Sequence, residues 1–218
     1  MSLQENIEKL SDSVKTENQQ CRYWMVRTNA GAYFNLFVKN GYVALSRNDI
    51  PYKLLHDAKQ QYSDKTNFVI KKVKETIKES SAINKSGYEE RSLSLAVSQV
   101  YKFVYEVQKN DIVIIPSENS DEICIGIFTE DHLADSQQTN ENFVYTRKVK
   151  WVKQLEKRYF DPFFYKLFTS HHAICDVSHY QEYIERCIRS QFVINDECHY
   201  VIALTSGEVP IRVMAEIL

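Results

Sequence analysis

The chain has 218 residues and a mass of 25.6 kDa, with 44% hydrophobic and 26% charged residues. This composition can bury a sizeable core, which excludes a disordered or fibrous protein. The net charge of −2 and the pI near 6.3 exclude a strongly cationic protein, so any contact with nucleic acid has to come from local patches.

The sequence also indicates the cellular compartment in which the protein is found. It contains no stretch near the roughly 18 consecutive apolar residues of a membrane span, and its polar start lacks the features of a signal peptide. The five cysteines are odd in number and have no CxxC spacing, which favours reduced, mostly buried thiols over a disulfide framework. We therefore expect a cytoplasmic protein without a membrane partner.

The first half of the chain predicts a mixture of strands and helices. Residues 1–20 indicate a polar amphipathic helix or a docked arm. Aromatic and β-branched residues predict a strand over 22–28, and a turn and a second strand over 41–45 follow. After Pro51 the pattern becomes helical as far as Ser81.

A loop over 80–92 is expected next, followed by a helix over 93–107 that Ser92 would cap. The apolar run 111–116 is typical of a buried strand. Residues 123–128 are its expected antiparallel partner, since only a short acidic turn separates the two runs.

Charge is unevenly distributed after this hairpin. Residues 118–141 hold seven acidic residues and no Lys or Arg, whereas 147–158 hold six basic residues and one acidic residue. In the strand expected over 143–152, apolar positions alternate with the cationic positions Lys148 and Lys150, and Lys153 follows. These three lysines could contact a nucleic-acid backbone, or they could simply maintain solubility.

Residues 156–218 form either a short α/β extension or the start of a downstream region. Their pattern predicts an amphipathic helix over 180–188, a strand over 199–204 and a final helical turn opened by Pro210. The chain ends within an apolar pattern that has no cap, so we expect a fragment of a longer protein.

Common catalytic motifs such as GxGxxG, GxxxxGK[ST], HExxH and GxSxG are absent from the sequence. A weak metal-site candidate remains in His171, His172, Cys175 and His179, where Cys175 and His179 would share a helical face. Cys187 or Cys198 would have to supply a further ligand through the fold. The alternative is an ordinary helix entry with a buried thiol and solvated imidazoles, and we predict no catalytic residue, metal or cofactor.

Several motifs occur in a family-like order: Tyr23-Trp-Met-Val-Arg-Thr28, Gly41-Tyr-Val-Ala-Leu-Ser46, Lys109-Asn-Asp-Ile-Val-Ile-Ile-Pro-Ser117, Ile125-Gly-Ile-Phe128 and Arg147-Lys-Val-Lys-Trp151. This order resembles the PUA-like superfamily. It is most similar to EVE domains and to the N-terminal modules of modification-dependent restriction and phage-defence proteins. The resemblance covers residues 21–155.

The resemblance implies an α+β fold: a small bent β-barrel decorated with helices, with a pocket beside the first two strands. By motif position, Arg27, Thr28 and Asn29 with Tyr33 or Phe34 would form one wall of this pocket. Ser46, Arg47 and Asn48 would form the other. Related modules often carry Gly-Trp where this chain has Ser46-Arg47, so one aromatic wall is missing.

The resemblance also implies a non-catalytic module that binds a nucleobase, modified or unmodified, in DNA or RNA. The chain would be the N-terminal part of a larger restriction or defence-type protein, and any nuclease activity would lie in a downstream domain. The alternative is a protein-interaction or regulatory scaffold whose acidic segment 118–141 docks a partner. A metal-dependent nuclease would need a metal bound at His171, Cys175 and His179.

Overall fold

The computed structural model describes residues 21–63, 65–80, 87–133, 143–160, 165–168, 170, 172–189, 191–194, 197–206 and 209–215. The helix or arm predicted over residues 1–20 lies outside this range. Within the described residues, no helix is both long enough and apolar enough to cross a bilayer.

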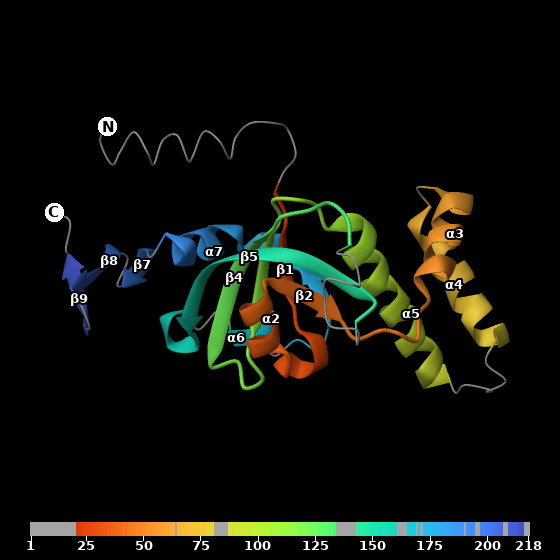
Figure 1. The fold of residues 1–218 in the computed structure, drawn as a ribbon, viewed down its shortest axis with the longest axis horizontal. Coiled ribbons are helices and arrows are strands. Elements are labelled where there is room, and N and C mark those ends of the chain that lie inside the picture. The colour runs from red at the N-terminus through yellow and green to blue at the C-terminus, as the bar shows by residue number, and fades with distance from the viewer. Residues whose placement is uncertain are drawn as a thin grey trace.

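A curled six-stranded sheet forms the centre of the molecule (Figure 1). Its strands are β1 (Tyr23–Val26), β2 (Tyr42–Leu45), β3 (Ile112–Pro116), β4 (Glu122–Phe128), β5 (Tyr145–Glu156) and β6 (Ile174–Asp176). They lie in the order β2-β5-β4-β3-β1-β6, with β1 and β3 parallel and the other neighbours antiparallel. The predicted α+β class and the β3–β4 pairing are confirmed.

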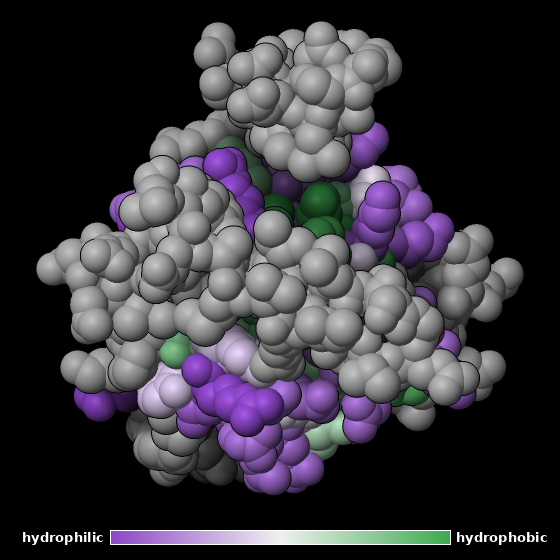
Figure 2. Space-filling view, turned by 90° about the vertical axis from the view of Figure 1, so that its left-hand side faces the viewer, coloured by the Kyte–Doolittle hydropathy of each residue, from purple (hydrophilic) through white to green (hydrophobic). Residues whose placement is uncertain are grey.

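The helices and the remaining strands surround this sheet. The helices are α2 (Phe34–Asn40), α3 (Tyr52–Tyr62), α4 (Thr66–Ser80), α5 (Gly87–Tyr101), α6 (Tyr165–Phe168) and α7 (Gln181–Ile188). A separate antiparallel sheet consists of β7 (Gln191–Ile194), β8 (Glu197–Ser206) and β9 (Val209–Ala215). Figure 2 views the molecule from the β7–β9 end, where the visible described residues are mostly hydrophilic around a small hydrophobic area.

Both faces of the sheet are covered, so the chain has two cores. In β1, Trp24 and Val26 belong to the larger core, which also contains residues of α2, α3, α4 and α5. Tyr23 and Met25 belong to the smaller core, with residues of α6 and α7. Because alternate side chains of a strand point to opposite faces, all four residues of β1 are buried. Trp24 is therefore a core residue rather than part of a pocket wall.

Helices α3 and α4 form a hairpin that packs along α5 and lies at the end of the molecule opposite β7–β9 (Figure 1). Val69, Val73 and Ile77 of α4 are buried at helical spacing, whereas the neighbouring Phe68 is exposed. Helix α5 thus lies between this hairpin and the sheet, and it has one face available for each.

Two predicted elements are wrong. The expected loop over 80–92 is shorter, since α5 already begins at Gly87 and Ser92 lies inside it rather than at its cap. The final helical turn at Pro210 is instead strand β9, in which the β-branched residues Val209, Ile211 and Val213 alternate. Pro210 is tolerated there because β9 is the edge of its sheet.

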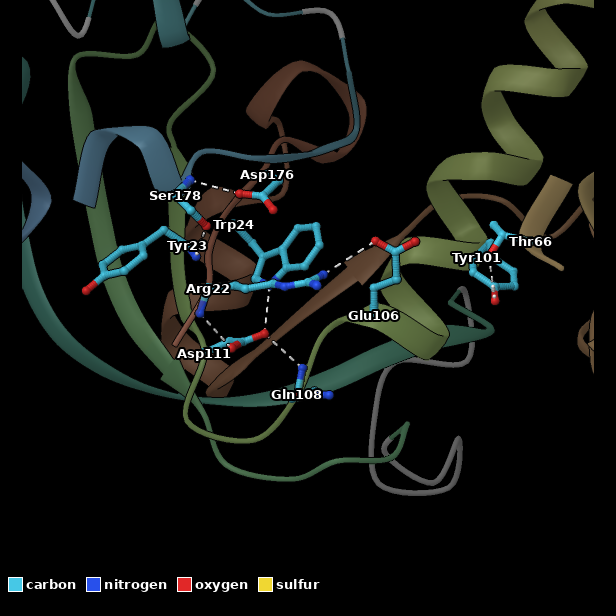
Figure 3. A network of polar contacts seen from close by, with 10 residues as sticks. All are labelled: Arg22, Tyr23, Trp24, Thr66, Tyr101, Glu106, Gln108, Asp111, Asp176 and Ser178. Carbon is cyan, nitrogen blue, oxygen red and sulfur yellow. Dashed lines mark hydrogen bonds and ion pairs between the residues drawn. The ribbon is translucent and has the colours of Figure 1, made fainter. Parts of the chain in front are cut away.

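A buried carboxylate attaches the start of the described chain to the sheet (Figure 3). Asp111 is 3% exposed; its Oδ1 accepts the main-chain N–H of Arg22 at 3.0 Å. Its Oδ2 accepts the Trp24 indole N–H at 2.8 Å and the main-chain N–H of Gln108 at 2.9 Å. The preceding Asn110 has a left-handed φ of 71°, a conformation that asparagine tolerates better than most residues.

Arg147, on β5, is a fully buried cation. Its Nε donates to the carbonyl of Phe103 at 2.7 Å and its Nη2 to that of Val104 at 2.9 Å. Further bonds of 3.1 and 3.3 Å reach the carbonyls of Glu130 and Asp131. Burial lowers the pKa of the Arg147 guanidinium to about 10, so the group remains charged at neutral pH.

These carbonyls need a donor because of where they lie in the helix. Phe103 and Val104 belong to the π-helical segment Lys102–Glu106, which continues α5 to its end. The last carbonyls of a helix have no partner within it, and a cation at that end is favourable. Arg147 therefore caps this helix, a role that its place in the basic run 147–158 did not indicate.

We expect Asp111→Asn to lower the free energy of unfolding by about 1–3 kcal/mol, because an amide NH₂ would face buried N–H donors. Urea denaturation of the variant measures this change. Asp121→Asn, at an exposed position, is the control and should stay within about 0.5 kcal/mol of the parent. An equal midpoint for both variants would contradict the role of Asp111.

We expect Arg147→Met to lower the free energy of unfolding by about 3 kcal/mol or more, since buried carbonyls would lose their donors. Arg147→Lys should fall between the parent and the methionine variant, because an ammonium cannot reach carbonyls on both sides as a planar guanidinium does. Chemical denaturation followed by circular dichroism measures both, with the exposed Arg158→Met as control. Parental stability of Arg147→Met would refute the cap.

Candidate functional site

A pocket of about 350 Å³ lies where the chain leaves β1 and β2. Residues 27–30 line one side of it, and Ser46 and Arg47 line another. Leu95 and Gln99 of α5 contribute a third side. Five of the eight predicted base-binding residues therefore meet in one pocket: Arg27, Thr28, Asn29, Ser46 and Arg47.

The two strand ends are joined directly. The buried hydroxyl of Thr28 donates a hydrogen bond to the main-chain carbonyl of Ala44 in β2. The next residues, Asn29 and Ala30, have left-handed φ values of 48° and 55°. Such a conformation costs a residue with a side chain roughly 1–2 kcal/mol, so the surroundings must hold this turn in place.

Gly31 is one part of what holds the turn. Its φ is +92°, and a Cβ at this position would lie 2.6 Å from the main-chain oxygen of Ser117. Only glycine fits so close to another segment of backbone. The strained turn is thus packed against the loop after β3, and the pocket wall that it forms is fixed before any ligand arrives.

Arg27 is anchored at the inner side of the pocket. Its Nη1 donates to the carbonyls of Phe168 at 2.7 Å and Ser170 at 3.4 Å, and its Nη2 donates to that of Glu118 at 3.3 Å. Its Nε is buried and has no hydrogen-bond partner among the described residues. A buried N–H without a partner costs free energy, and a ligand that accepts from it would recover that cost.

Arg47 lies nearer the opening, with 31% of its side chain exposed. Its Nη2 pairs with the carboxylate of Asp49 at 2.8 Å, and its buried Nε also lacks a partner within the described chain. The described residues that line the pocket include no Asp, no Glu and no aromatic residue. The site therefore offers cationic N–H donors, and the one described carboxylate that pairs with them, that of Asp49, is not among the residues that line the pocket.

The other three predicted residues lie elsewhere. The ring of Tyr33 packs edge-on against Phe143, with 4.9 Å between ring centroids, and Phe34 is 4% exposed in the larger core. Both are placed there because helix α2 begins at Phe34 and turns its aromatic face inward. Asn48 accepts the main-chain N–H of Val144 at 3.3 Å and so holds the loop after β2 against the start of β5.

Sequence reasoning missed the side of the pocket formed by α5. Ser92, Leu95, Ala96 and Gln99 recur every three or four residues, which places them on one helix face. That spacing was visible in the sequence, but only the fold shows that this face lies opposite the ends of β1 and β2. Gln99 is buried, and its amide is 3.1 Å from Nδ1 of His172.

The three lysines predicted to contact a nucleic-acid backbone have different surroundings. Lys148 pairs with Glu130 at 3.0 Å, so the acidic segment partly neutralises the basic strand. Lys153 is half-buried, and burial lowers the pKa of its ammonium group. Lys150 is exposed. A bulge at Ile125 and Gly126 of β4 lies opposite Trp151 and Lys153 and interrupts the simple alternation expected for this strand.

The predicted helical face of Cys175 and His179 is wrong, because Cys175 lies in strand β6 and His179 in a 3₁₀ turn. His171 lies outside the described residues. Burial raises the pKa of the Cys175 thiol, which favours its unreactive protonated form. In the part of the chain that the structure describes, no three His, Cys, Asp or Glu side chains are grouped as metal ligands would be.

Comparison of the chain with curated proteins and with solved structures finds no match. Residues 54–174 match a family described as "Domain of unknown function (DUF8426)". The matched range runs from α3 to β6 and contains the α5 side of the pocket, whereas β1 and β2 precede it. Since the match covers more than half of the sequence, the chain belongs to this DUF8426 family.

Proposed function

We propose that this chain is a non-catalytic recognition module that binds DNA or RNA at the pocket between β1, β2 and α5. The observation that carries the proposal is the pair of arginines, Arg27 and Arg47, which line one pocket and whose buried Nε–H groups have no described partner. Polyanions favour such a site, because two guanidinium groups line it and, within the described chain, only Arg47 pairs with a carboxylate, that of Asp49.

Recognition of a nucleobase is chemically compatible with this pocket. An arginine fork pairs with two acceptors on a base edge, as with O6 and N7 of guanine, and guanidinium planes also stack on bases. The amides of Asn29 and Gln99 add donors and acceptors at the same pocket. Stacking on aromatic walls, worth about 1–3 kcal/mol per base, has no counterpart among the described lining residues.

The finer fold assignment belongs to the same proposal. The curled sheet, the parallel pairing of β1 with β3 and the pocket beside the first two strands support a PUA-like, EVE-type domain. The rival function, a protein-interaction scaffold that uses acidic segment 118–141, receives less support. Two of its acidic side chains already have internal partners, since Glu130 pairs with Lys148 and Glu122 accepts from Gln154 at 3.2 Å.

Fluorescence polarisation with short single-stranded and double-stranded oligonucleotides, with and without modified cytosine or adenine, tests the proposal at two salt concentrations. We expect binding that weakens as salt increases, because bound phosphates release counterions. Tighter binding of a modified oligonucleotide would identify the pocket as a reader of that base. No binding to any oligonucleotide at low salt would refute the proposed function and favour the scaffold.

We expect Arg47→Ala to weaken oligonucleotide binding roughly 10- to 100-fold, the effect of losing charge-assisted hydrogen bonds. Arg158→Ala is a closely matched control, since Arg158 pairs with Glu156 at 2.8 Å just as Arg47 pairs with Asp49 at 2.8 Å. Circular dichroism checks the fold of both variants. Equal affinities would remove Arg47 from the binding site.

We expect Lys150→Gln to reduce the slope of log affinity against log salt by about 0.9 for duplex DNA, or about 0.7 for a single strand, if Lys150 contacts one phosphate. Polarisation titrations at four salt concentrations measure the slope. Lys39→Gln, at an exposed position in α2, is the control. An unchanged slope for Lys150→Gln would assign this lysine to solubility.

A further inference from the structure

The hydrogen bonds that Arg27 already makes define which of its donors remain. A guanidinium has five N–H groups. Within the described chain, the three acceptors on Arg27 occupy Nη1 and one N–H of Nη2, which leaves Nε–H and the other Nη2–H. The Nε–H and one Nη2–H of any guanidinium lie on one edge, which can pair bidentately with carboxylate or phosphate oxygens.

The rest of the pocket favours an anion of high charge density over a flat, neutral ring. Arg47 adds a second cation whose Nε is also unpartnered among the described residues. Ser46, Ser92 and Asn29 contribute short polar side chains. Of the two rings that would have stacked on a base, Phe34 is in the core and Tyr33 is partly buried against Phe143. The pocket thus has hydrogen-bond donors for several oxygen atoms but few groups that could stack on the faces of a ring.

The pocket is also held rigid. Thr28 is bonded to β2, Gly31 packs against the backbone of Ser117, and the main-chain N–H of Arg27 donates to Ala173 at 2.9 Å. Donors that are fixed in advance lose little entropy when they bind, so a small anion can be held tightly by few contacts.

From these observations we propose that the pocket binds a phosphate monoester, with the guanidinium groups of Arg27 and Arg47 as its principal donors. This inference deepens the proposed function and rests on it where the monoester is the terminal phosphate of a nucleic-acid strand. A monoester carries a charge of about −1.5 to −2 and three terminal oxygens at pH 7, whereas an internal phosphodiester has one charge and two such oxygens. A strand end would therefore bind better than the middle of a strand, and a free nucleotide offers the same chemistry.

The test compares one oligonucleotide carrying a 5′-phosphate, a 3′-phosphate or only hydroxyl ends, by fluorescence polarisation. Inorganic phosphate and adenosine monophosphate serve as competitors. We expect one phosphorylated end to bind at least tenfold more tightly than the hydroxyl-ended strand. This preference should decrease between pH 7.5 and 5.5, because the second phosphate pKa is about 6 and the monoester loses charge below it.

Variants test whether the preference for a phosphorylated strand end comes from the pocket. Arg27→Lys keeps the charge but loses the bidentate edge, so we expect it to abolish most of the preference. Because Arg27 also donates to three main-chain carbonyls, its substitution also removes contacts that support the fold. Ser46→Glu therefore provides a second test that leaves both arginines in place. It adds a negative charge at the exposed rim and should reduce the preference at least fivefold. Asn67→Glu, which adds the same charge on the exposed surface of α4, should not.

The outcomes separate this inference from the proposed function. Equal binding of phosphorylated and hydroxyl-ended strands would overturn the monoester site and leave nucleic-acid recognition standing. A preference that Ser46→Glu and Arg27→Lys both leave intact would also overturn it. Binding of adenosine monophosphate or inorganic phosphate without any oligonucleotide binding would support a monoester site whose ligand is a free small molecule rather than a strand end. The same result would refute the proposed function. No binding of any of these probes would refute both.

Discussion

Much of this fold depends on one buried cation. Arg147 has no exposed surface, and it donates to main-chain carbonyls from the end of α5 and from the segment after β4. A guanidinium can do this because its donors point in several directions within one plane. Since β5 lies between β2 and β4, the same contacts fix α5 relative to the strands that form the pocket.

The geometry of the pocket depends on this placement of α5 relative to the sheet. Its residues come from the ends of β1 and β2 and from one face of α5, so it exists only when the helix is correctly placed over the sheet. Asp111 contributes from the other side, because its carboxylate fixes Arg22 and Trp24 and thereby the start of β1. Arg147 thus fixes α5 and Asp111 fixes the start of β1, and the pocket is lined by α5 and by the residues that follow β1.

Neighbouring charges in this sequence serve different purposes. The acidic and basic segments around β4 and β5 partly neutralise each other through Lys148 with Glu130, and Arg147 donates to main-chain carbonyls of the acidic segment. The arginines of the pocket instead retain unpartnered Nε–H groups within the described residues. Charge that is paired internally supports the fold, whereas unsatisfied donors in a pocket are available for a ligand.

The sequence by itself determined the α+β class, the strands around Trp24 and Val113, their alternation and the helical stripe of α5, because these follow from local periodicity. The resemblance of its motifs to a known family also placed Arg27 and Arg47 at the same candidate site. Tertiary structure alone decided that Arg147 is buried, that Phe34 is a core residue with Tyr33 packed against that core, and that α5 lines the pocket. Those outcomes depend on which distant segment covers each side chain, and periodicity within one segment carries no information about its neighbours in space.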